Sequence, residues 1–335
     1  MGFDLSIVWF GIIVFATLMY IVMDGFDLGI GILMPMVTRG EARDTMVNSV
    51  APVWDGNETW LVLGGAALFG AFPLAYSVII DALTIPLTLM LVALIFRGVA
   101  FEFRFKAWAH HRVFWDRAFM VGSIAATFCQ GMVVGAVIQG IAVEHRHYAG
   151  GAFDWLTPFS LFCGLGLVVT YALLGATWLI MKTEGHLQQR FFGMAPRILT
   201  MQLAVMIAVS AWTALAQPSI ATRWLSVPNV LWLSAVPLAT GLLAWAAYRA
   251  LARHADRLPF VATLGMVLLG FVGLGISLWP NIIPPSVTLW QAASPPQSQG
   301  FMLVGALFII PFILMYTFWS YAVFGGKVKD GEAYH

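Results

Sequence analysis

Long apolar segments follow one another along almost the whole chain, and they constrain the fold more than any other feature. Only 10% of the 335 residues are charged and 60% are hydrophobic, whereas a soluble domain carries about 25% charged residues. A segment of about 20 apolar residues crosses roughly 30 Å of hydrocarbon. The sequence therefore predicts an all-α polytopic membrane protein, one domain over residues 1–335, with no soluble enzyme domain and no nucleic-acid partner. Its nine predicted spans lie near 3–37, 50–72, 78–101, 118–143, 157–181, 198–217, 230–249, 259–280 and 301–324.

The first span and two connections between spans are distinctive. The first span is long for one crossing, so we expect it to be tilted, bent or extended beyond the membrane. Residues 73–77 are predicted to be a short turn, and residues 281–300 a longer loop rich in Pro, Ser and Gln.

Basic residues alternate between the two sides of the predicted bundle and give its orientation. Basic loops are retained in the cytoplasm, so the N-terminus is expected in the periplasm and the C-terminus in the cytoplasm. The sparse side has only Arg146 and Arg223. The other 15 of the 17 lysines and arginines fall on the predicted cytoplasmic side: Arg39, Arg43, Arg97, Arg104, Lys106, Arg112, Arg117, Lys182, Arg190, Arg197, Arg249, Arg253, Arg257, Lys327 and Lys329.

Four carboxylates stand in pairs inside the first two spans. Asp24 and Asp27 are three residues apart, as are Asp55 and Glu58, and this spacing puts both members of a pair on one helix face. The two spans are antiparallel, so Asp27 is expected level with Asp55 and Asp24 level with Glu58. At 1.5 Å per residue all four lie on the order of 10–20 Å in from the cytoplasmic turn.

These carboxylates have no evident cation inside the membrane. Arg97 is expected near the cytoplasmic end of the third span, and no lysine or arginine is expected in the middle of a span. Burying an unpaired carboxylate costs several kcal/mol, so protonation, hydration or a partner from another chain is expected. If the two pairs face each other, they form a ladder of acids reached from the cytoplasm, which is what a proton relay needs.

Helix capping is the structural alternative. Asp55 is a candidate N-cap with Pro52 near the helix start, although capping does not require two acids on one face twice. A fifth acid, Asp81, is expected toward the outer end of its span as an ordinary interfacial carboxylate.

Cofactor and catalytic motifs do not emerge from the sequence. Membrane haems are usually held by histidines within spans, whereas every histidine here is expected in a loop or at the terminus. Cys129 and Cys163 are expected to be buried apolar residues. No phosphate loop, zinc spacing or nucleophile–base arrangement is present, so no catalytic or metal residue is predicted. The histidines are His110, His111, His145, His147, His186, His254 and His335.

Three motifs resemble one known family. The stretch Asp24-Gly25-Phe26-Asp27-Leu28-Gly29 resembles the DGFDLG signature of subunit II of cytochrome bd-type quinol oxidases. Residues 48–61, NSVAPVWDGNETWL, resemble that family's NS-x-AP-x-WDGN-x-x-WL stretch, and residues 97–104, RGVAFEFR, are similar to its third block. The chain is at the short end for this subunit, with little in the loops at 218–229 and 281–300, and in this it resembles the cyanide-insensitive branch of the family.

The resemblance implies a haem-free subunit of a bacterial inner-membrane enzyme that oxidises quinol and reduces dioxygen to water. The implied partner, subunit I, holds haems b558, b595 and d. This subunit would stabilise that partner and contribute acids to cytoplasmic proton uptake. By motif position, Asp27 and Asp55 match the functionally implicated acids, and Asp24 and Glu58 match their motif neighbours. A structural quinone or lipid in this chain and a small accessory subunit stay open.

Two alternatives from other classes remain at this point. A proton-coupled secondary transporter would use the acid pairs as coupling sites. A purely structural scaffold subunit would use them to bond to the polar groups of a partner.

Overall fold

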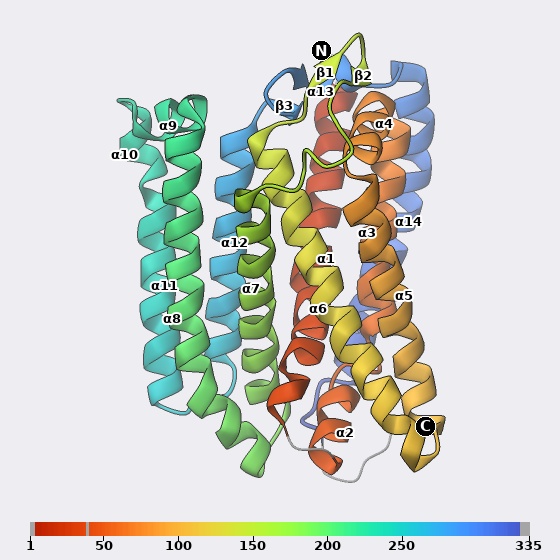
Figure 1. The fold of residues 1–335 in the computed structure, drawn as a ribbon, viewed down its shortest axis with the longest axis vertical. Helices are drawn as coiled ribbons and strands as arrows, with labels where there is room; N and C mark the ends of the chain where they lie inside the picture. The colour runs from red at the N-terminus through yellow and green to blue at the C-terminus, as the bar shows by residue number, and fades with distance from the viewer. Residues whose placement is uncertain (1–3, 38–39, 329–335) are drawn as a thin grey trace.

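The computed structural model describes residues 4–37 and 40–328 as a bundle of long helices, with two small hairpins at one end (Figure 1). In this part of the chain, eight helices are long and apolar enough to cross a membrane. A ninth candidate span joins α3 (Trp54–Ala71) to α4 (Pro73–Ala82), which bend from each other by 118°. The predicted all-α polytopic fold is confirmed.

The elements follow one another along the chain with short connections. In chain order they are α1 (Leu5–Leu33), η1 (Met34–Met36), α2 (Glu41–Asn48), α3 (Trp54–Ala71), α4 (Pro73–Ala82), α5 (Thr84–Lys106), α6 (Ala109–Gln139), β1 (Val143–Glu144), β2 (His147–Tyr148), α7 (Pro158–Lys182), α8 (Gly185–Ala216), α9 (Pro218–Leu225), α10 (Asn229–Leu233), α11 (Ala235–Ala252), α12 (Leu258–Leu278), β3 (Asn281–Ile283), β4 (Val287–Thr288), α13 (Leu289–Ala292) and α14 (Pro296–Val323).

Some predicted boundaries are wrong. The turn predicted at 73–77 is the start of α4, because Pro73 suits the first turn of a helix. The next span, predicted at 78–101, is therefore displaced to α5. The helices α6 and α8 begin well before residues 118 and 198, since their polar first turns extend the helix beyond its apolar stretch. The predicted loop 281–300 contains the β3–β4 hairpin, α13 and the start of α14.

The helices α1, α6 and α7 pack at the centre of the bundle (Figure 1). A Cβ atom on Gly29 of α1 would lie 2.0 Å from the backbone oxygen of Tyr171, so these backbones touch at a point where only glycine fits. Gly131 of α6 similarly meets the backbone of Cys163 on α7. Both cysteines are free and buried, as predicted.

The two ends of the bundle differ in charge. At the end where α1 begins, Trp290 Nε1 donates to Asp4 Oδ2 at 2.7 Å, and this hydrogen bond lowers the pKa of the Asp4 carboxyl. At the opposite end, Lys327 pairs with Asp256 at 2.8 Å, next to the end of α7. This second end is the side that the sequence predicts to be rich in lysine and arginine. Arg39, Lys329 and the first residues of the predicted span 3–37 lie outside the described residues.

Candidate functional site

One buried arginine gathers three of the four predicted acids. The Arg97 guanidinium on α5 lies 2.8 Å from Asp24 Oδ1, 3.6 Å from Asp27 Oδ2 and 3.7 Å from Glu58 Oε2. Asp24, Asp27 and Arg97 have no exposed surface, and the Glu58 side chain is 27% exposed. We call these four residues the acid cluster. It joins α1, α3 and α5 at one depth in the bundle.

The cluster corrects the expectation that no cation lies inside the membrane. Because α5 runs to Lys106 instead of ending near residue 101, Arg97 lies about two turns inside its end and not at it. Aromatic rings surround the guanidinium: its central carbon is 5.4 Å from the Phe101 ring centroid and 6.0 Å from that of Trp54. These two rings stack on each other at 4.9 Å.

Hydrogen bonds tie Asp27 to two other helices. Asn57 Nδ2 on α3 donates to Asp27 Oδ2 at 2.8 Å, and the Tyr321 hydroxyl on α14 donates to Asn57 Oδ1 at 2.9 Å. Neither Asn57 nor Tyr321 was predicted as a site residue. Asn57 lies within the motif that includes Asp55 and Glu58, and this position was the available signal. Nothing local in the sequence marks Tyr321.

A second buried polar group continues from the cluster toward the centre of the bundle. Tyr20 lies one turn before Asp24 on α1, and its hydroxyl accepts a hydrogen bond from Gln130 Nε2 at 2.6 Å. The Tyr171 hydroxyl donates to Gln130 Oε1 at 3.2 Å. These groups connect α1, α6 and α7 around the inner side of the acid cluster.

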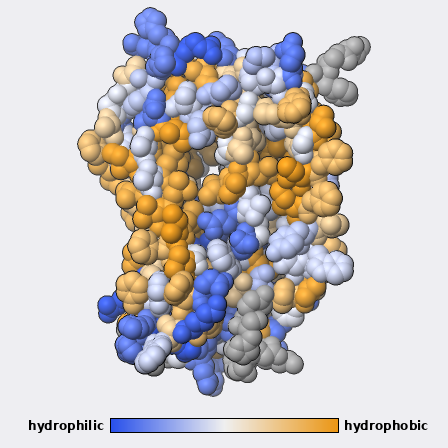
Figure 2. Space-filling model, turned by 90° about the vertical axis from the view of Figure 1, so that its right-hand side faces the viewer, coloured by the Kyte–Doolittle hydropathy of each residue, from blue (hydrophilic) through white to orange (hydrophobic). Residues whose placement is uncertain are grey.

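Asp55 and Asp81 do not join the cluster. Asp55 is exposed in the first turn of α3, where a helix N-terminus favours a carboxylate. Asp81 is exposed near the end of α4. The face formed by α3, α5 and α14 is hydrophobic over its middle and carries a hydrophilic patch in its lower half (Figure 2). Only Asp55, among the four predicted acids, is fully at the surface of the isolated chain.

A second group of ion pairs lies at the arginine-rich end. Arg104 of α5 bonds to Asp116 Oδ1 of α6 and pairs with Asp44 Oδ1 of α2, both at 2.7 Å. Arg43 donates to Asp116 Oδ2 at 2.9 Å. We call Arg43, Asp44, Arg104 and Asp116 the turn network, because it anchors the α1–α3 connection to the α5–α6 hairpin.

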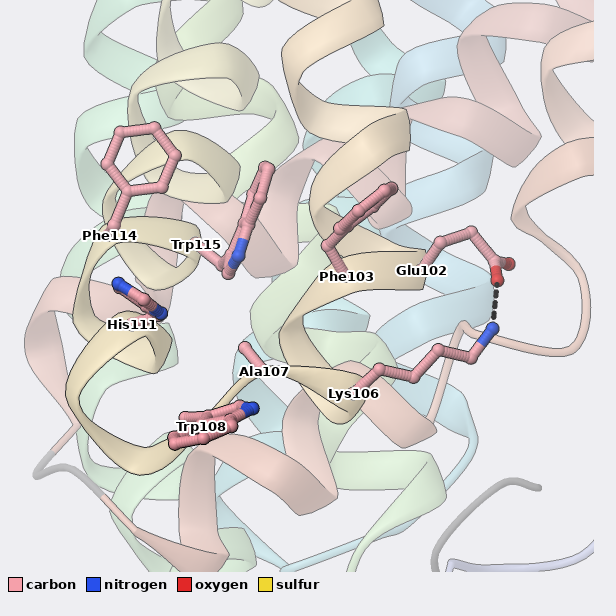
Figure 3. A pocket seen from close by; sticks show the side chains of 8 residues that line it. All are labelled: Glu102, Phe103, Lys106, Ala107, Trp108, His111, Phe114 and Trp115. Atoms are coloured by element: carbon pink, nitrogen blue, oxygen red, sulfur yellow. Dashed lines mark hydrogen bonds and ion pairs between the residues drawn. The ribbon is translucent and has the colours of Figure 1, made fainter.

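Two cavities lie near the arginine-rich end. The first, of about 550 Å³, lies between the ends of α5 and α6. Phe103 and Trp115 lie next to each other in its wall, with ring centroids 5.1 Å apart, and Glu102 pairs with Lys106 (Figure 3). The second, of about 400 Å³, is lined by residues of the α2–α3 connection and by the ends of α7 and α14. Of these two cavities, the second is the one lined by Tyr321, whose hydroxyl bonds to Asn57 beside the acid cluster.

The described histidines offer no pair of haem ligands in the middle of a span. In the described residues, histidines occupy helix ends and connections and not the middle of a span, and no group of three or more His, Cys, Asp or Glu side chains forms a metal site. Accordingly we assign no electron-transfer step to this chain. His110, His111 and His186 lie in first helical turns, not in loops as predicted, and His335 lies outside the described residues.

Comparison with known proteins decides the family. A sequence model described as "Cytochrome bd terminal oxidase subunit II" matches residues 5–324. The chain belongs to this family. A bd oxidase subunit II is part of a membrane-bound respiratory oxidoreductase, and it implies a partner subunit I, to which the haems and iron belong.

Relatives of this subunit II cover nearly its full length. The chain is 29% identical over 370 residues to cytochrome bd-I ubiquinol oxidase subunit 2 of Escherichia coli (strain K12), covering 97% of this chain and 96% of the relative. It is 28% identical over 344 residues to cytochrome bd ubiquinol oxidase subunit 2 of Bacillus subtilis (strain 168), covering 97% of each. The solved bd oxidase from Geobacillus thermodenitrificans shares the fold, with a TM-score of 0.76 at 18% identity, over 94% of this chain and 99% of that chain.

Proposed function

We propose that this chain is the haem-free subunit of a bd-type quinol oxidase in the bacterial inner membrane. It stabilises the haem-bearing subunit I, and it carries protons from the cytoplasm toward the site where that subunit reduces dioxygen to water. The family match favours this function over a secondary transporter. The observation that carries the proton role is the unequal number of charges in the acid cluster.

The acid cluster holds three carboxylates and a single guanidinium. If all four were ionised, the cluster would carry two excess negative charges, and two of its carboxylates have no contact with solvent. An uncompensated buried charge costs several kcal/mol. Each bound proton removes one of the two excess charges and so lowers that cost, which suits the cluster to take up and release protons while Arg97 stays charged.

The contacts of Asp27 fit the same role. Its Oδ2 accepts a hydrogen bond from Asn57 and lies near Arg97. Its Oδ1 is buried and has no hydrogen-bond partner in the described part of the chain. A bare carboxylate oxygen in apolar surroundings is a favourable place for an incoming proton.

The order of the acids gives a direction. Asp55 is at the surface, Glu58 lies one turn further along α3 and is partly exposed, and Asp24 and Asp27 are fully buried. Protons would therefore enter at Asp55, pass Glu58 and reach the buried pair. Uptake from the cytoplasm, combined with release of the quinol's protons outside, would build a proton-motive force without a pump.

Conservative substitutions in the assembled oxidase test this function. Asp27→Asn and Asp55→Asn keep the side-chain size and remove the ionisable group, so oxygen consumption per haem should fall in both variants if these acids carry protons. The fall should be about ten-fold or more in Asp27→Asn, because Asp27 lies at the buried end of the route. Asp81→Asn is the matched control and should leave the rate unchanged. Full oxygen consumption with normal haem spectra in both variants would falsify the proton role. A scaffold role instead predicts less assembled complex with a normal rate per haem.

A further inference from the structure

The second cavity approaches the acid cluster through Tyr321, which lines it. Its volume of about 400 Å³ is enough for roughly a dozen waters at ~30 Å³ each. Its wall combines polar and charged side chains, including Ser49, Lys182, Tyr321 and Lys327, with apolar ones such as Val53. A roomy cavity with several polar partners is one that water occupies. We call this cavity the vestibule.

A short chain of side chains connects the vestibule to the cluster. Tyr321 lines the vestibule, and its hydroxyl donates to Asn57 at 2.9 Å. Asn57 in turn donates to Asp27 at 2.8 Å, so two hydrogen bonds separate the vestibule from a fully buried acid. Asp55 takes no part in this connection and does not line the vestibule.

The C-terminal segment after α14 covers the outer side of the vestibule. Lys182 Nζ, at the end of α7, donates to the backbone carbonyls of Phe324 at 2.6 Å and Gly326 at 3.1 Å. The Val328 amide donates to the Lys182 carbonyl at 2.8 Å. Lys327 pairs with Asp256 in the α11–α12 connection. The vestibule therefore lies at the arginine-rich end, which the sequence predicts to be cytoplasmic.

We propose that the vestibule is a second cytoplasmic route for protons to Asp27, parallel to the route that begins at Asp55. This inference rests on the proposed function of the acid cluster. Asn57 closes the route in the observed geometry, because an amide does not pass a proton without changing its tautomer. When its side chain turns away, a water bridges the Tyr321 hydroxyl and Asp27.

The transfer of a proton from the vestibule to Asp27 needs no co-reactant. A hydronium in the vestibule gives a proton to the Tyr321 oxygen, and the tyrosine passes its own hydrogen to the bridging water. That water gives a proton to the Asp27 carboxylate. Tyr321 and the water end as they began, and Asp27 gains one proton.

Thiol labelling tests whether water from the cytoplasm reaches the vestibule. Ser49→Cys places a thiol on its wall, and native Cys129 and Cys163, which are buried elsewhere in the bundle, serve as internal controls. In the assembled oxidase, a membrane-impermeant charged maleimide added from the cytoplasmic side should label residue 49 at least about ten times faster than either native cysteine. Mass spectrometry of this subunit measures the labelling. Equal, negligible labelling of all three thiols overturns the proposal, whatever the role of Asp27.

Double substitution tests whether the two routes are parallel. Tyr321→Phe removes only the hydroxyl at the inner end of the vestibule, and Tyr316→Phe on the exposed side of the same helix is the matched control. Oxygen consumption per haem should fall about two-fold in Tyr321→Phe and in Asp55→Asn, and more than about ten-fold in the double variant.

The possible outcomes distinguish a failure of the second route from a failure of the proposed proton uptake through the acid cluster. A double variant no slower than the slower single variant would mean that the two residues act in series, and it overturns the second route. So does a Tyr321→Phe rate equal to that of Tyr316→Phe. Full activity of Asp27→Asn would instead overturn the proposed function, even with the vestibule labelled.

Discussion

The acid cluster and the turn network each contain an arginine of α5, Arg97 and Arg104, which lie two helical turns apart. The two groups differ in their ratio of arginines to carboxylates. The turn network has two arginines for two aspartates, with contacts of 2.7 to 2.9 Å, and the exposed Arg112 adds a third arginine 3.6 Å from Asp44. The acid cluster has one arginine for three carboxylates, with contacts of 2.8 to 3.7 Å. A network with at least as many arginines as carboxylates has no excess negative charge that would favour a bound proton, whereas a network with excess carboxylates lowers its free energy by binding one. The first is suited to hold helices together and the second to exchange protons.

Their surroundings differ in the same direction. In the turn network the Asp44 side chain is 29% exposed, so water at the end of the bundle can solvate a charge that loses its partner. In the acid cluster Arg97, Asp24 and Asp27 are completely buried. The loss of one charge should therefore cost more in the acid cluster than in the turn network.

Removing the central arginine of each group should give the largest effects. Arg97→Gln leaves three carboxylates without a cation, and breaking a buried pair costs about 3–5 kcal/mol. We expect haem-containing oxidase in membranes to fall below about a tenth of the normal amount. Arg104→Gln is the matched control, and its loss should be closer to about 1–3 kcal/mol, since the buried Asp116 keeps Arg43 as a partner and water reaches Asp44. Haem absorbance per milligram of membrane protein measures both. Equal losses would remove the distinction between the two groups.

A charge-compensating double variant sharpens the comparison. Asp24→Asn in the Arg97→Gln background removes one of the uncompensated charges, so it should restore about a third or more of the assembled oxidase. The same Asp24→Asn change in the Arg104→Gln background removes no charge from the turn network and should restore nothing. Haem content of solubilised membranes reports both. If rescue occurs in both backgrounds, or in neither, charge balance is not what distinguishes the two groups.

The fold was largely predictable from the sequence because membrane spans are encoded locally. Apolar length gives each span, and the placement of lysine and arginine gives the alternation of the two sides. Boundaries were harder to predict where a helix continues past its apolar stretch, as in α8, or where a proline starts a short helix, as at Pro73.

The site was predictable only in part, because its other members come from distant segments. The i, i+3 spacing put Asp24 and Asp27 on one face of α1, and the structure brings them together with Glu58. Whether Asp55 points inward depends on how α3 rotates against its neighbours, which no local pattern specifies. Arg97 was assigned to the wrong depth because the α5 boundary was wrong by about one turn.

Removing one acid from the turn network should separate stability from turnover. Asp116→Asn removes the carboxylate shared by Arg43 and Arg104 while keeping the side-chain size. It should lower the free energy of unfolding by about 1–3 kcal/mol and leave oxygen consumption per haem unchanged. Thermal unfolding of the purified complex and oxygen uptake measure the two quantities. A fall in the rate per haem like that of Asp27→Asn would place the turn network on the proton route.

Neutralising the outermost member of the acid cluster should have the smallest effect. Glu58 lies 3.7 Å from the guanidinium and is partly exposed, so its interaction with Arg97 is screened by solvent. In Glu58→Gln, Asp24 still pairs with Arg97 at 2.8 Å and Asp27 keeps its bond to Asn57. Assembly should stay normal and oxygen consumption per haem should fall by less than about three-fold. Asp27→Asn, measured in parallel, provides the larger reference. An equal loss in the two variants would mean that Glu58 is an obligatory step, and that the cluster acts as one unit and not as a buried pair with an outer approach.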